Sequence, residues 1–284
     1  MSPLPVKASR NAALTGAALI AFAANSLLCR AALGPGVIDA GSFTAVRLGS
    51  GAVVLALLAR PRSADRAGGS WASAAALFAY AIAFSFAYRL IPAGSGALIL
   101  FGSVQATMIG RELGRGGRPH RREWLGLAVA LAGLLALTRP GLHAPDPRGA
   151  ALMAVAGVAW GAYSLRGRGA TRPLAATADN FTRSVPLAIL PLLLPLAPLR
   201  LSVAGVLLAV VSGAIASGLG YVAWYAALRE LSASRAAIVQ LAVPPLAALG
   251  GVLFLGETLE ARLLLGGAAI LGGIAIALTT PTRA

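Results

Sequence analysis

Acidic side chains are scarce in this chain of 284 residues, which has 9 Asp and Glu against 24 Lys and Arg. Charged residues of both signs make up only 12% of the sequence, whereas about a quarter of the residues in soluble domains are charged. So few ionic groups cannot coat a surface that faces water, which excludes a soluble globular enzyme. Intrinsic disorder is excluded as well, because disordered chains combine low hydrophobicity with high charge.

Cysteine and histidine are almost missing, which limits the chemistry that the chain can perform. Cys29 is the only cysteine, so the sequence offers neither an internal disulfide nor a metal cluster held by cysteines. The two histidines, His120 and His143, lie in basic segments, and we expect neither a metal nor a cofactor. Lys7 is the only lysine, and neither a Walker motif nor a Gly-x-Ser-x-Gly sequence occurs. We therefore expect a protein that is not an enzyme.

Apolar sequence is what the chain has in abundance: 58% of its residues are hydrophobic, and its mean hydropathy is +0.80. A membrane-spanning helix needs about 20 apolar residues. Apolar runs of suitable length lie near residues 11–29, 41–59, 71–90, 93–110, 123–138, 149–165, 180–198, 203–228, 233–255 and 262–280. The runs are continuous and lack the alternation of barrel strands. The sequence predicts an all-α integral membrane protein with ten transmembrane helices.

The basic residues predict how these helices are oriented. With ten spans, 16 of the 24 Lys and Arg fall on one side of the membrane and 6 on the other, while Arg47 and Arg183 lie within spans. The positive-inside rule then predicts that both termini lie in the cytoplasm. We expect the protein in the bacterial inner (plasma) membrane. The basic excess is explained by this rule, so we expect contact with membrane lipid and none with nucleic acid.

The two halves of the chain resemble one another. Residues 12–14 and 150–152 both read Ala-Ala-Leu, and Phe43-Thr44 matches Phe181-Thr182 at the same shift of 138 residues. The two halves, residues 1–140 and 141–284, would each hold five spans, an odd number, and so would enter the membrane from opposite sides.

Such inverted repeats are typical of secondary transporters, whose binding sites lie between the repeats near the middle of the membrane. We predict one integrated unit of two inverted five-helix repeats around a central cavity. The alternative is a duplication that has been retained only for packing.

Short motifs add a family resemblance to this pattern. Leu255-Gly256-Glu257 closes the ninth span after Pro244-Pro245, and together with the two five-span repeats it resembles the EamA-type drug/metabolite transporter superfamily. Within it, residues 24–30 (Ala-Asn-Ser-Leu-Leu-Cys-Arg) look most like the aromatic amino-acid exporters. The first half departs from the pattern, because the corresponding Leu-Gly-Glu ending is lost around residues 110–113.

The resemblance implies a secondary transporter that exports small metabolites by alternating access, with aromatic or hydrophobic amino acids as the leading small-molecule substrates. Nucleotide sugars or drug-like metabolites are the alternative substrates. A membrane-embedded enzyme or a lipid scramblase is the alternative from another class of function.

Aromatic residues are only 6% of the chain, so their positions are informative. Tyr80, Phe84 and Tyr88 share one face of the third span, and Tyr221 and Trp224 share a face of the eighth. Together with polar residues of the neighbouring spans, such faces could stack flat rings and hydrogen-bond their substituents. The predicted substrate-binding residues are Asn25, Ser26, Arg47, Tyr80, Phe84, Tyr88, Trp160, Tyr163, Tyr221, Trp224 and Gln240. The alternative role of the rings is packing between helices.

Two of these polar residues carry alternatives of their own. Gln240 precedes Pro244-Pro245, and these prolines predict a broken helix in span nine; the glycines of span four predict a matching break there. The Gln240 side chain could line the binding segment, or it could form a hydrogen bond with a neighbouring helix. Arg47 lies about two turns inside its span, where a charge is costly. It could hold a substrate carboxylate, or it could snorkel or pair with Asp39.

Two further features concern oligomeric state and energy coupling. Gly157 and Gly161 form a Gly-x-x-x-Gly pattern that predicts close approach to a helix within the bundle in preference to a dimer, so we expect a monomer or a weak dimer. All acidic residues are predicted at span ends or in loops, which leaves no carboxylate to carry a proton through the membrane. The sequence therefore predicts uncoupled facilitated diffusion.

Overall fold

The computed structural model describes residues 4–59, 68–116, 120–138, 146–193 and 198–256, with isolated helical residues between 265 and 276. Within these ranges the regular structure is helical, apart from an isolated antiparallel β-bridge between Ile38 and Leu201. The predicted all-α class is confirmed for this part of the chain.

The helices follow the apolar runs. The first half contains α1 (Leu4–Leu33), α2 (Ala40–Ala59), α3 (Trp71–Ala87), α4 (Ala93–Leu113) and α5 (Arg121–Thr138). The second half contains α6 (Pro147–Gly167), α7 (Pro173–Leu193), α8 (Val203–Val211), the π-helix η1 (Ser212–Leu219), α9 (Gly220–Leu228), α10 (Ala233–Gln240) and α11 (Val243–Leu255). The predicted span at residues 262–280 lies mostly outside the described residues.

Five stretches of the described chain are long and apolar enough to cross a membrane. They are Ser9–Leu33, Ala40–Ala59, Ala93–Arg111, Val203–Leu228 and Ile238–Leu255, and α3 is a shorter apolar helix. The remaining helices, α5, α6 and α7, coincide with further predicted spans. A multi-pass membrane protein is thus supported, and the count of ten stays a prediction.

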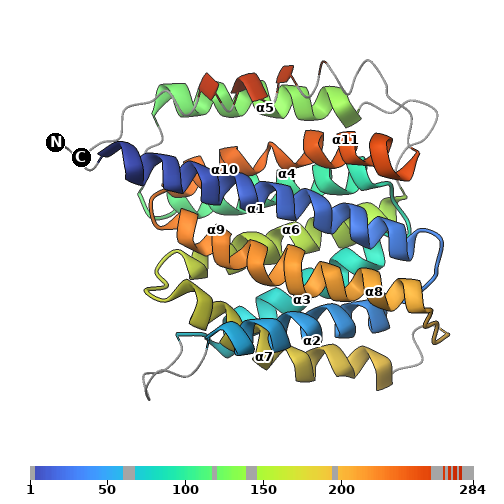
Figure 1. Ribbon diagram of the computed structural model, residues 1–284. Helices are drawn as coiled ribbons and strands as arrows, with labels where there is room; N and C mark the ends of the chain where they lie inside the picture. The colour runs from blue at the N-terminus through green and yellow to red at the C-terminus, as the bar shows by residue number, and fades with distance from the viewer. Residues whose placement is uncertain are drawn as a thin grey trace.

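The helices lie side by side with their axes roughly aligned, α5 along one edge and α2 with α7 along the other (Figure 1). Helix α6 packs against α3 and α4, while α1 packs against α9 and α11. In the two predicted repeats α1 corresponds to α6, α3 to α8 and α9, and α4 to α10 and α11. The contacts of α6 therefore correspond to those of α1, and the packed pair α2–α7 joins two corresponding helices. This is the packing that two inverted repeats would produce, although the repeat itself remains a prediction.

Large apolar side chains face outward on many helices. Leu57, Leu193, Val203 and Phe254 are all at least 70% exposed. A soluble monomer rarely exposes apolar surface on this scale, whereas lipid tails solvate it without penalty. The outward faces of the bundle therefore suit a bilayer.

Two of the long apolar runs are irregular in the middle. The run 203–228 passes through the π-helix η1, and the run 233–255 breaks between Gln240 and Val243. The second break confirms the prediction from Pro244-Pro245, since proline removes a backbone donor. The matching prediction for span four is wrong: α4 continues unbroken from Ala93 to Leu113, because glycines weaken a helix without removing its hydrogen bonds.

Candidate substrate-binding site

Arg47 lies at the centre of the described bundle, on α2, and is fully buried. Its Nε donates a hydrogen bond to Ser217 Oγ (2.9 Å), and its Nη2 donates to the hydroxyls of Tyr80 (3.2 Å) and Tyr221 (2.9 Å). The guanidinium carbon also lies 5.2 Å from the ring centres of Tyr80 and Phe84. Helices of both halves of the chain thus hold one buried cation.

The pairing with Asp39 considered for Arg47 is wrong, and so is snorkelling. Asp39 instead accepts from the backbone N–H groups of Ser42 (2.9 Å) and Arg200 (3.1 Å) at the start of α2. Eight helical residues separate the two side chains along the axis by about 12 Å, which is too far for a direct ion pair. The Arg47 side chain therefore stays inside the bundle, with its Nη1 lacking a hydrogen-bond partner.

Trp160 of α6 brings together rings from three other helices, α1, α3 and α9. Its indole centre lies 5.2 Å from that of Phe22, 5.1 Å from Tyr80 and 4.6 Å from Tyr221. The neighbouring Tyr163 is 5.6 Å away on the same helix. Tilted and edge-on contacts at these distances are the favourable arrangements of aromatic pairs.

We call the connected rings the aromatic cluster. They are Phe22, Tyr80, Phe84, Tyr88, Trp160, Tyr163, Phe181, Tyr221, Trp224 and Tyr225. The structure brings every predicted aromatic site residue into it. Phe22, Phe181 and Tyr225 were not among the predicted site residues, although the repeat match at Phe181 and the helical spacing of Tyr225 were available signals.

The cluster fills the place where a central cavity was predicted. Its neighbouring ring centres are 4.6 to 6.5 Å apart, and all of its members are buried. In this conformation the rings contact one another, so a substrate of similar size could enter only if the helices that carry them moved apart.

Asn25 joins α1 to this network. Its side-chain N–H donates to the Tyr80 hydroxyl (3.2 Å), and its oxygen accepts from Ser212 Oγ (2.6 Å). Ser26, by contrast, donates back to the carbonyl of Phe22 in its own helix (3.4 Å). The structure thus places Asn25 among the cluster's polar groups, and Ser26 is buried without a bond to them.

Gln240 connects the broken helix to the cluster. Its side-chain oxygen accepts from Trp160 Nε1 (2.8 Å), and its amide donates to the Ala236 carbonyl (3.2 Å) and the Met108 sulfur (3.6 Å). The hydrogen bond between helices that was the structural alternative for Gln240 is confirmed. Trp224 is held similarly, since its indole N–H donates to Ser164 Oγ (3.3 Å).

Ser212 and Ser217 are site residues that the sequence analysis missed. Both lie in η1 and bond Asn25 and Arg47, respectively. The i, i+4 spacing of Ser217 and Tyr221 was an available signal. A π-helix shifts the helical register, so ordinary α-helical spacing gives no signal that Ser212 joins them.

Comparison with known proteins gives a family for the second half of the chain. Residues 147–279 match the EamA-like transporter family, and the chain is 54% identical to an uncharacterised protein of Pseudomonas aeruginosa over 95% of its own length and 94% of the relative's. The second half of this chain is thus an EamA-like transporter family domain. The members of this family are transporters.

Two more distant matches follow, one in sequence and one in structure. A protein of Streptantibioticus cattleyicolor named as a probable terminal-alkyne amino-acid exporter is 28% identical over 80% of each chain. A crystal structure with 21% identity superposes with a TM-score of 0.73, covering 92% of this chain and 96% of the other. The similarity to the crystal structure shows the fold.

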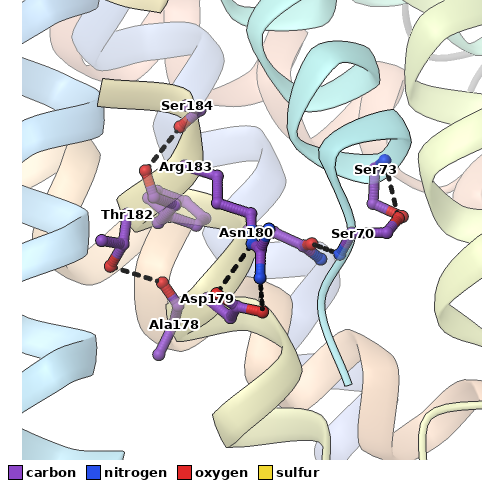
Figure 2. A network of polar contacts seen from close by, with 9 residues as sticks. Ser70, Ser73, Ala178, Asp179, Asn180, Thr182, Arg183 and Ser184 are labelled. Carbon is purple, nitrogen blue, oxygen red and sulfur yellow. Dashed lines mark hydrogen bonds and ion pairs between the residues drawn. The ribbon is translucent and has the colours of Figure 1, made fainter. Parts of the chain in front are cut away.

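Polar contacts join the start of α3 to α7 at one end of the described bundle (Figure 2). The Ser70 backbone N–H donates to the Asn180 side-chain oxygen (3.0 Å), and the Ser70 hydroxyl caps α3 at the backbone N–H of Ser73 (3.1 Å). Beside them, Arg183 pairs with Asp179 at 2.9 and 3.2 Å. We call these contacts the Asn180 network.

At the opposite end, hydrogen bonds join the segments that precede α2 and α8. Asp39 and Arg200 exchange backbone and side-chain hydrogen bonds of 3.0 and 3.1 Å, and the Ser202 N–H donates to the Val37 carbonyl (3.1 Å). Burial raises the pKa of Asp39, but hydrogen bonds from Ser42 and Arg200 outweigh it and hold the pKa below its ordinary value. This Asp39 network, like the Asn180 network, joins one half of the chain to the other.

Proposed function

We propose that this protein is a secondary transporter that exports aromatic or other hydrophobic amino acids across the bacterial inner membrane by alternating access. The observation that carries the proposal is the convergence of aromatic and polar side chains from both halves of the chain on buried Arg47. The aromatic side chains of the site could stack on the ring of a substrate, while a small number of polar groups orient it. The amino-acid exporter among the distant relatives supports the same substrate class.

The movement that admits a substrate follows from where the rings are attached. Tyr80 and Phe22 belong to the first half, whereas Trp160 and Tyr221 belong to the second. Rocking one half against the other would separate these rings at one end while the network at the other end stays closed. We expect such motion to be easiest at η1, where the α-helical hydrogen-bond pattern changes to a π pattern, and at the break between α10 and α11.

We further propose that transport is uncoupled from a proton gradient. Arg47 is the charged side chain buried among the described residues, and arginine keeps its proton in proteins. The acidic residues that the structure describes lie at or near helix ends, such as Asp39, Asp146 and Asp179. Substrate would then flow down its own gradient through a monomer or weak dimer with both termini in the cytoplasm.

Counterflow in proteoliposomes tests the proposal. Liposomes loaded with unlabelled phenylalanine are diluted into labelled phenylalanine, tryptophan, leucine, glutamate or a nucleotide sugar. We expect transient accumulation of the aromatic and apolar amino acids. If liposomes loaded with unlabelled nucleotide sugar accumulated the labelled nucleotide sugar, and no amino acid was exchanged, the alternative substrate class would be favoured.

A pair of tryptophan variants links transport to the cluster. Trp160→Ala removes a central ring, and Trp124→Ala removes a tryptophan that is 45% exposed at the start of α5. Because aromatic contacts contribute about 0.5–1.5 kcal/mol each, we expect Trp160→Ala to lower counterflow several-fold at equal abundance and Trp124→Ala to leave it unchanged. Equal transport by both variants would return Trp160 to a packing role.

A further inference from the structure

The charge of Arg47 is not balanced by any residue that the structure describes. The described ion pairs join Arg183 to Asp179 and Arg235 to Glu123, and neither includes Arg47. Arg47 instead has neutral partners, two phenols and one serine. A fully buried cation without a counter-charge is costly, and the cost falls when an anion binds beside it.

The free side of the guanidinium indicates which anion would fit. Nε and Nη2 are occupied, whereas Nη1 is buried and has no hydrogen-bond partner. A planar guanidinium recognises a carboxylate by parallel N–H···O bonds. The phenols of Tyr80 and Tyr221, which share Nη2, can also donate to a carboxylate oxygen because a phenol both donates and accepts. The apolar remainder of such a ligand would lie against Phe84 and Trp160.

The same site offers no charged partner for an ammonium group. The other polar side chains of the described cluster are uncharged: Asn25, Ser164, Ser212, Ser217 and Gln240. Aromatic faces attract an ammonium group, but the nearby Arg47 repels it. The electrostatics of the site therefore favour one end of an amino acid over the other.

We propose that this site, resting on the transport function proposed above, selects its substrates by a carboxylate bound to Arg47 and an aromatic or apolar body, and that the α-amine is dispensable. The substrate class is then apolar monocarboxylates, of which amino acids are one kind. A zwitterionic amino acid moves no net charge, whereas a deaminated acid moves one negative charge. Membrane potential should change the flux of the acid and leave that of the amino acid unchanged.

Two competitors that share the phenyl body separate the two ends of the ligand. Phenylalanine counterflow is measured with unlabelled 3-phenylpropionate, which lacks the amine, or 2-phenylethylamine, which lacks the carboxylate. Because a hydrogen-bonded charge contributes more than a neutral contact, we expect the amine to compete about tenfold less well than the acid, or worse. Equal competition by the two compounds would overturn the inference while leaving amino-acid transport intact.

Variants of two arginines assign the preference to one side chain. Arg47→Gln should abolish the preference for the acid, and Arg47→Lys should keep part of it because the positive charge remains. Arg148→Gln removes an exposed arginine at the start of α6 and should keep all of it. If Arg47→Gln does not fold, the inference is tested by comparing the competition measured on the unmodified protein with that measured on Arg47→Lys. An unchanged preference in a folded Arg47→Gln would also contradict the inference.

Equilibrium binding distinguishes failure of the inference from failure of the proposed function. Labelled phenylalanine and labelled 3-phenylpropionate are incubated with the protein in detergent. Binding of both without counterflow would refute the transport proposal and support the carboxylate site. Binding of phenylalanine without 3-phenylpropionate, or of neither, would overturn the carboxylate site.

Discussion

The Trp160–Gln240 hydrogen bond is the clearest single interaction that ties the broken helix to the rest of the cluster. Trp160→Phe keeps a ring but leaves the Gln240 oxygen without this donor. Polar contacts within membrane bundles contribute about 0.6 kcal/mol on average and up to about 1.7. We therefore predict a loss of stability in that range, measured by reversible unfolding in mixed micelles.

A double-mutant cycle separates the hydrogen bond from the lost indole. Gln240→Leu alone leaves the Trp160 N–H unpaired, whereas the double variant with Trp160→Phe removes both partners. The double variant should lose less stability than the sum of the single ones, because no unpaired group remains at that bond. Strict additivity would show that the bond contributes nothing.

At the residue scale, the sequence predicted which residues lie in the cluster better than it predicted which residues they contact. Helical spacing found Tyr80, Phe84, Tyr221 and Trp224, because aromatic residues at i, i+3 and i+4 share a face wherever the helix lies. Helical spacing could not predict the hydrogen-bond partners of Arg47. Its partner Ser217 lies 170 residues away in the chain, and only the tertiary packing of two halves brings them together.

The π-helix η1 is the element on which the site depends most closely. A Cβ at Gly213 would collide with the backbone carbonyl of Arg47 and with Ser50 Oγ, so glycine is what allows α2 to approach η1 at the arginine. Gly49, on α2, has open space around its Cα. The two glycines form a matched pair for substitution.

Gly213→Ala is expected to push α2 away from η1. Overpacking of this kind costs about 1–3 kcal/mol, and the displaced Arg47 would lose its bond to Ser217. We predict a lower thermal stability and a large loss of counterflow. Gly49→Ala should be neutral or slightly stabilising, because alanine favours a helix over glycine by about 1 kcal/mol. Wild-type behaviour of Gly213→Ala would show that the close approach is unimportant.

At the element scale, composition predicted where helices run and only partly where they bend. Pro244-Pro245 marked the break before α11, because a missing N–H is a local property that the sequence displays. The π-helix carries no such mark, since Ser212–Leu219 contains no proline. The glycine pattern of span six was read correctly: Gly157 and Gly161 face Leu100, Ser103 and Thr107 of α4 inside the bundle.

The orientation of the whole molecule rests on its arginines and can be tested by labelling. After Cys29 is replaced by serine, single cysteines are placed at the exposed positions Pro35, Arg200, Arg115 and Arg229. An impermeant maleimide added to intact cells should label Pro35→Cys and Arg200→Cys, which flank the Asp39 network. It should label Arg115→Cys and Arg229→Cys only after the membrane is opened. Labelling of the latter pair in intact cells would reverse the orientation.

The two end networks give the whole molecule its proposed mechanism. The Asn180 network and the Asp39 network lie at opposite ends of α2, and each joins the two halves of the chain. We expect the two networks to open in turn as alternating access proceeds. The sequence predicted two inverted repeats, but it could not predict the contacts that join their ends, because these depend on backbone hydrogen bonds between distant segments, such as Asp39 with Arg200.

The most direct test of this account is phenylalanine movement in proteoliposomes with and without an imposed pH step. The account predicts counterflow that requires the protein, that is lowered by Trp160→Ala, and that is the same with or without the pH step, since Arg47 keeps its proton. Uphill accumulation of phenylalanine driven by the pH step alone would contradict uncoupled alternating access and would direct attention to the carboxylates at the helix ends, beginning with Asp39.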